Sequence, residues 1–78
     1  MTHTLDTLQK LYDSEINFDL FCFWDAGFAA RLGDEHNGYV WEEDQFETIA
    51  LAVEALVKAA VEYYPDSEFA KNYGGSNG

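Results

Sequence analysis

The stretch Asn-Phe-Asp-Leu-Phe-Cys-Phe-Trp at positions 17–24 decides the fold, because it reads as a β-strand with bulky apolar side chains on both faces. Successive side chains of a strand point to opposite faces of the sheet. One face then needs a covering helix, and the other carries a surplus of aromatic surface that needs a second partner. The covered set is Phe18, Leu20, Cys22 and Trp24, and the opposite set is Asn17, Asp19, Phe21 and Phe23.

Two further strands are expected directly after this one. Residues 25–27 form a short connection ending in glycine, and the alternation resumes over 28–32 with Phe28 and Leu32 on the covered face. A polar turn over 33–38, with Asn-Gly at its end, then leads into a third short strand over 39–42. These three segments predict an antiparallel β-meander, with Val40 on the covered face.

Helical patterns flank the meander. Apolar residues recur at spacings of three and four over 4–13, which predicts a short helix, and the same spacing over 44–64 predicts a long one. Asp44 is the expected N-cap of the long helix, with Glu47 three residues later as in a capping box. Its expected buried stripe is Phe46, Ile49, Ala50, Val53, Leu56, Val57, Ala60 and Tyr64.

The expected class is therefore α+β, with one domain over 1–73. Pro65 either ends the long helix or begins a last turn over 66–73, and residues 74–78 are expected to form a disordered tail. On the outer side of the long helix, Leu51 lies among Ala52, Ala55 and Ala59. That row is either plain helix-forming surface or a seam for a second copy.

Charge is the unusual property of the chain. Its 78 residues include 15 acidic and 4 basic side chains, a net charge of −11. Such a charge argues against direct nucleic-acid binding and favours a cationic partner or a strongly solubilising surface. A single cysteine, no signal-peptide pattern and no long apolar run predict a cytoplasmic protein without membrane contact.

No residue pattern indicates catalysis. His36 with Asp34 and Glu35 is compatible with a metal loop, but no second His or Cys stands at ligand spacing, which favours a solvated turn. Cys22 has no basic sequence neighbour and is expected to be a buried structural thiol. The sequence therefore predicts neither an enzyme, a metal site nor a cofactor site.

The surplus face of the sheet is the candidate contact surface. Phe21, Phe23, Tyr39 and Trp41 are expected there, with Arg31 close by. Open aromatic sheets can stack unpaired bases, but the net charge of −11 opposes a polyanionic ligand. Either the first helix crosses this face and buries it, or the face binds another chain.

A small acidic chain of this layout resembles the anti-CRISPR proteins of phages and mobile elements and, to a lesser degree, the anti-restriction DNA mimics. The resemblance is one of size, charge and layout over the whole chain. It implies binding to the basic nucleic-acid channel of a CRISPR surveillance complex; the alternative is a domain that binds a second copy of itself. The resemblance itself carries over no residue; the acidic clusters and aromatic side chains of the sequence give the expected contact residues, which are Phe21, Phe23, Asp34, Glu35, Tyr39, Trp41, Glu42, Glu43, Asp44 and Glu47.

Overall fold

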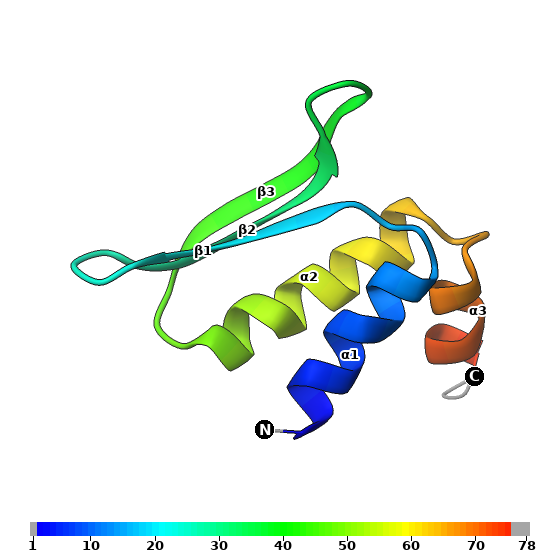
Figure 1. The fold of residues 1–78 in the computed structure, drawn as a ribbon, viewed down its shortest axis with the longest axis horizontal. Helices are drawn as coiled ribbons and strands as arrows, with labels where there is room; N and C mark the ends of the chain where they lie inside the picture. Colours follow the sequence, from blue (N-terminus) through cyan, green and yellow to red (C-terminus); the bar gives the residue numbers. More distant parts are fainter. Residues whose placement is uncertain (1, 76–78) are drawn as a thin grey trace.

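A three-stranded antiparallel sheet with helices on one side forms the fold in the computed structural model (Figure 1), which describes the backbone of residues 2–75 and the side chains of residues 5–72. The strand order is β1-β2-β3. The predicted α+β class with a β-meander is confirmed. Along the chain the elements are α1 (Thr2–Asp13), β1 (Phe18–Phe23), β2 (Gly27–Asp34), β3 (Gly38–Phe46), α2 (Ile49–Tyr63) and α3 (Glu68–Gly75).

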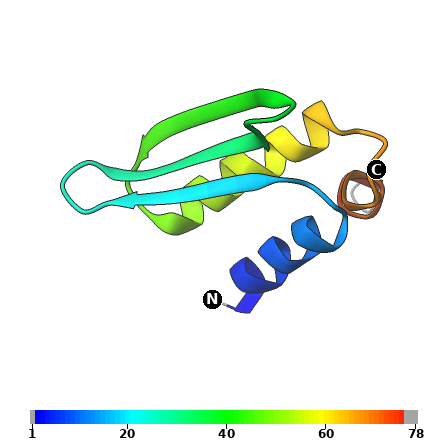
Figure 2. The same ribbon diagram turned by 45° about the horizontal axis from the view of Figure 1, so that its top comes forward.

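All three helices lie on the same side of the sheet (Figures 1 and 2). The core between the two layers includes Leu11 of α1, Leu32 of β2 and Leu56 of α2, each fully buried. Burial of a leucine side chain is worth about 1.5–3 kcal/mol, so these contacts hold the layers together. Of the two alternatives for the opposite face, the one in which the first helix crosses it is wrong, because α1 contributes to this core. We call the face turned away from the helices the outer face.

The long helix begins later than predicted. Thr48 is its N-cap, and the hydroxyl oxygen of Thr48 accepts a hydrogen bond of 3.1 Å from the backbone N–H of Leu51. Asp44, the predicted N-cap, instead belongs to β3, which continues until Phe46 pairs with Phe28 of β2. Both residue types are good N-caps, and strand pairing, which is not local in sequence, decides between them.

The buried side of α2 also differs from the predicted stripe. Val53 and Leu56 are buried as expected, but Ile49 is 41% exposed while Ala52 is fully buried. Because α1 and α3 pack beside α2 as well as the sheet above it, the helix is buried over a wider arc than one stripe. Ala52 and Ala59 therefore belong to the core and not to a seam for a second copy, whereas Leu51 is exposed as predicted.

Two register shifts in β3 alter which side chains face outward. Between the pairs Leu32–Trp41 and Gly33–Tyr39, β3 has one residue more than β2, and this extra residue is Val40. Such a bulge interrupts the alternation of a regular strand. Tyr39 therefore faces outward while Trp41 packs against the core. The predictions that Trp41 faces outward and that Val40 is covered are both wrong, since Val40 is 44% exposed.

The β1–β2 hairpin extends beyond the helices (Figure 1), so its inner side is uncovered near the turn. Cys22 is exposed there, and Trp24, in the turn itself, is 94% exposed. The predictions of a buried thiol and an inward-facing Trp24 are therefore wrong. Alternation indicated the face correctly for Phe18 and Leu20, which pack against the core, but it cannot indicate where the covering layer ends.

The third helix follows the turn after Pro65. The hydroxyl oxygen of Ser67 accepts a hydrogen bond of 3.1 Å from the backbone N–H of Ala70, as an N-cap does. Phe69 of this helix is 3% exposed and closes the end of the core. The predicted tail overlaps α3 at Gly74 and Gly75, and the rest of it, 76–78, lies outside the described residues.

Candidate functional site

The outer face of the sheet is the candidate site. Strand partners share a face, so the pairs Asp19–Arg31, Phe21–Ala29 and Arg31–Glu42 define which side chains lie on it. Within the described residues no helix packs on this face (Figure 2). The face is made of Asp19, Phe21 and Phe23 from β1, Ala29 and Arg31 from β2, and Tyr39, Glu42 and Asp44 from β3.

Arg31 lies at the centre of the outer face and is held mainly by aromatic rings. Its guanidinium carbon is 4.8 Å from the ring centroid of Phe21 and 4.1 Å from that of Tyr39. One of its terminal nitrogens forms an ion pair of 3.2 Å with Asp19. Stacking of a guanidinium on aromatic rings is worth about 0.5–1 kcal/mol at exposed sites. Arg31 and the two rings therefore form one contiguous cluster.

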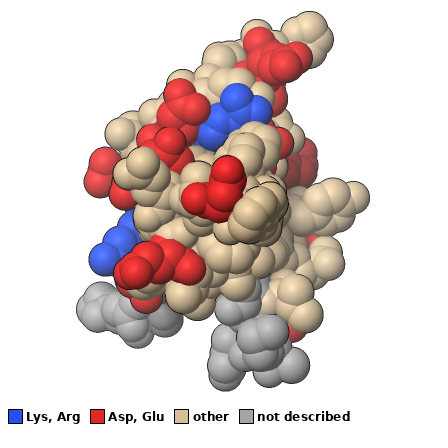
Figure 3. All heavy atoms as spheres, turned by 90° about the vertical axis from the view of Figure 1, so that its left-hand side faces the viewer, with Lys and Arg blue, Asp and Glu red and all other residues tan. Residues whose placement is uncertain are grey.

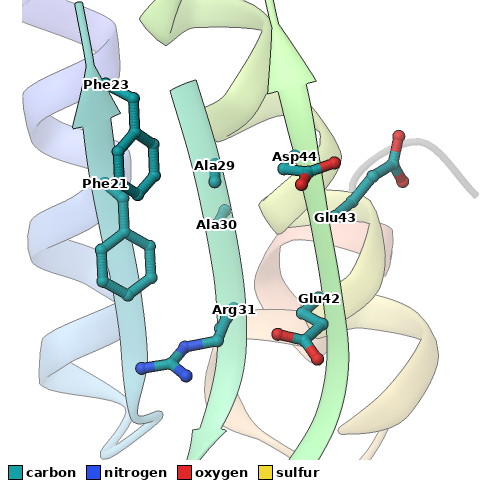
Figure 4. A pocket seen from close by; sticks show the side chains of 8 residues that line it. All are labelled: Phe21, Phe23, Ala29, Ala30, Arg31, Glu42, Glu43 and Asp44. Carbon is teal, nitrogen blue, oxygen red and sulfur yellow. The ribbon is translucent and has the colours of Figure 1, made fainter. Parts of the chain in front are cut away.

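A hollow of about 410 Å³ lies beside this cluster (Figure 4). Phe21 and Phe23 form one wall, stacked with ring centroids 6.1 Å apart and an interplanar angle of 23°. Glu42 and Asp44 stand on the opposite side, and Ala29 lies in the floor between them. Arg31 also contributes to the lining, so the hollow has an aromatic wall, a carboxylate wall, a small floor and one basic lining residue.

The acidic run at positions 42–44 forms no ion pair with the other described residues. Glu42, Glu43 and Asp44 are all exposed, and among the described residues the only ion pair recorded joins Arg31 to Asp19. Figure 3 shows acidic side chains spread over the end of the molecule that carries the β1–β2 turn, with few basic ones among them. A run of unpaired carboxylates next to aromatic side chains favours contact with a cationic surface.

The structure divides the predicted contact residues into separate groups. Phe21, Phe23, Tyr39 and the acidic run lie together on or beside the outer face, whereas Trp41 contacts the core. Asp34 ends β2 and Glu35 begins the β2–β3 turn, which projects at the other end of the sheet from the β1–β2 turn (Figure 1). Glu47 is exposed in the connection between β3 and α2.

Three contributors to the outer face were not among the predicted contact residues: Ala29, Asp19 and Arg31, the last of which was expected close by. Ala29 forms the floor of the hollow, and Asp19 holds Arg31. Alternation placed all three of them on this face. The signal for Ala29 is that a small side chain in the middle strand, opposite a Phe, leaves a depression between larger neighbours. The signal for Asp19 is an acid opposite a base on the neighbouring strand.

The carboxylate of Asp34 is engaged in hydrogen bonds at the β2–β3 turn. It accepts hydrogen bonds from the backbone N–H of Asn37 at 2.8 Å and from the side-chain amide of Asn17 at 2.9 Å. The bond from the Asn37 N–H is the main reason why the pKa of Asp34 lies below its usual 3.8. A hollow of about 570 Å³ adjoins this turn, but Asp34, which contributes to its lining, is engaged in these internal contacts.

We expect Asp34→Asn to make stability less dependent on pH. A lowered folded-state pKa stabilises the fold above the usual carboxyl pKa, and this contribution disappears as the pH falls through the folded-state value. The melting temperature of the variant should therefore be lower than that of the natural protein at pH 7, and the two should converge below pH 3.8. Thermal unfolding at several pH values measures this difference. Asp25→Asn, at an exposed turn position, removes the same charge and is the control; its melting temperature at pH 7 should be close to that of the natural protein.

Among the described residues, no group of three or more His, Cys, Asp and Glu side chains is arranged to hold a metal ion. None of the described helices is both long enough and apolar enough to cross a membrane.

Comparison of the chain with protein-family models, with curated proteins and with solved structures finds no match. The geometry and charge of the outer face are therefore the basis on which a function can be argued.

Proposed function

We propose that this protein is a non-enzymatic inhibitor that binds the basic nucleic-acid channel of a CRISPR surveillance complex and thereby blocks target DNA. It would act in the cytoplasm, without cofactor and without touching nucleic acid itself. The observation that carries the proposal is the outer face: an uncovered sheet with Phe21 and Phe23 beside the unpaired carboxylates of Glu42, Glu43 and Asp44.

The chemistry of a nucleic-acid channel matches this face. Such a channel presents lysine and arginine side chains to phosphates, and a protein that supplies carboxylates in their place competes with the DNA. The net charge of −11 steers the protein toward a basic surface and away from DNA. Phe21 and Phe23 supply apolar area at the centre, where binding energy is usually concentrated.

Competition for target DNA tests the proposal. A CRISPR surveillance complex is incubated with this protein, labelled target DNA is added, and the DNA that remains bound is followed on a native gel. We expect loss of the DNA complex with increasing protein, and weaker inhibition as salt screens the charges over about 8 Å at physiological ionic strength. Undiminished DNA binding at saturating protein, across a panel of CRISPR and restriction complexes, would contradict the proposal.

The alternative is a domain that buries its outer face against a second copy. Phe23 on the outer face is 50% exposed and Trp24 in the adjacent turn is 94% exposed, and such exposed aromatic surface favours self-association. Repulsion between two chains of charge −11 opposes it. We therefore expect a monomer in sedimentation velocity at micromolar concentration. A dimer that dissociates in the variant Phe23→Asp would instead favour the alternative.

A further inference from the structure

Arg31 shows how the outer face binds a guanidinium group. The group lies over the rings of Phe21 and Tyr39, 4.8 and 4.1 Å from their centroids, and one carboxylate, that of Asp19, approaches it within 3.2 Å. The planar guanidinium thus receives aromatic surface and a single charge partner.

The adjacent hollow repeats these elements one step along the sheet. Phe23 stacks on Phe21 and extends the aromatic wall, and Asp44 supplies a carboxylate across the floor formed by Ala29 (Figure 4). Glu42, the cross-strand partner of Arg31, adds a second carboxylate to the lining. The hollow therefore offers an aromatic ring on which a guanidinium group can stack and a carboxylate with which it can pair.

Among the described residues, no basic side chain is available to pair with Asp44 in this hollow. The chain contains four basic side chains. Arg31 is one of the residues that line the hollow, but its guanidinium is paired with Asp19 and lies over the rings of Phe21 and Tyr39. Lys10, Lys58 and Lys71 belong to the three helices, on the other side of the sheet. An incoming cation must therefore come from another molecule.

We propose that the hollow binds an arginine side chain of the partner protein, stacked on Phe23 and paired with Asp44. Arginine fits better than lysine, because a planar guanidinium stacks on a ring and a carboxylate can accept two of its N–H groups. This inference rests on the proposed function for the existence of a basic partner. It adds which side chain is recognised and where.

Binding of N-acetyl-arginine amide, followed by ¹H–¹⁵N spectra of the whole protein, tests the site. We expect saturable shifts centred on Phe23, Ala29 and Asp44, smaller ones with N-acetyl-lysine amide, and none with the uncharged analogue N-acetyl-citrulline amide. The spectra also report whether each variant is folded.

Two substitutions distinguish a specific arginine site from general electrostatic attraction to an acidic protein. Phe23→Leu keeps an apolar side chain without the ring, Asp44→Asn removes one charge, and each should weaken arginine binding about threefold. Asp25→Asn removes the same charge in the hairpin turn and should have no effect. Shifts spread over acidic residues in general, equal binding of the citrulline analogue, or no response to either substitution would overturn the proposal. So would ligand-free shifts of the same amides with protein concentration, because a second copy would then occupy the hollow.

The outcome is independent of the competition experiment. Arginine binding without inhibition of any nucleic-acid complex would leave the site standing and remove the proposed function. Inhibition that is unaffected by Phe23→Leu and Asp44→Asn, in a protein that does not bind the arginine amide, would support the proposed function and overturn the arginine site.

Discussion

Replacement of Val53 by aspartate is expected to unfold the domain. Val53 is 5% exposed and lies in the core cluster with Leu32 and Leu56, so a carboxylate there would lose its hydration without gaining a partner. Keeping such a carboxyl neutral at pH 7 requires a pKa raised by about 3 units, which costs about 4 kcal/mol. A domain of this size has about 4–12 kcal/mol of stability in total.

Leu51→Asp is the matched control for this substitution. It introduces the same side chain into the same helix at a position that is 44% exposed, and its effect should stay within about 0.5 kcal/mol. Thermal unfolding followed by circular dichroism distinguishes the two variants. A cooperative transition in Val53→Asp at the temperature of the natural protein would mean that α2 does not pack on the sheet through this side.

The layout of the fold was predictable because its apolar pattern is locally regular. The alternation over 17–24 indicated correctly that Phe18 and Leu20 face the core and that Phe21 and Phe23 face outward. Helical spacing likewise indicated that Val53 is buried. In these segments each side chain's environment follows from the period of its own element.

The errors lie where the structure depends on distant residues. Tyr39 and Trp41 are two apart and would share a face in a regular strand, but the bulge at Val40 separates them. The bulge arises where β3 pairs with Gly33, whose φ of +117° is accessible to glycine, and a Cβ there would stand 2.5 Å from the carbonyl oxygen of Gly38. Pairing of this kind is not encoded in the pattern of β3 alone.

The sequence indicated the main aromatic and acidic residues of the candidate site, but it did not indicate how they are arranged in space. The aromatic residues of β1 and the acidic run 42–44 were both evident, but their proximity follows from β3 continuing past Glu42 to Phe46 beside β2. Had the helix begun at Asp44, as the N-cap pattern predicted, Asp44 would have stood at a helix end. The longer strand places it across from Phe23, with Ala29 in between (Figure 4).

Reversal of Glu42, Glu43 and Asp44 to lysine is expected to abolish the proposed inhibition. Each carboxylate is exposed and without a recorded ion pair, so the fold should tolerate the change. In the complex, three attractive contacts with a basic channel would become repulsive ones. A loss of about 1 kcal/mol or more at each position weakens binding by a factor of at least about 100.

A control triple with the same change in charge makes this result specific. Asp6, Glu54 and Asp66 are exposed and lie in or beside the helices, so their reversal to lysine also changes the net charge from −11 to −5 but leaves the outer face intact. The competition gel, run with both variants over a series of salt concentrations, should show strong inhibition only with the control triple. Equal losses in the two variants would mean that net charge alone drives binding, and full inhibition by the 42–44 variant would move the contact away from the outer face.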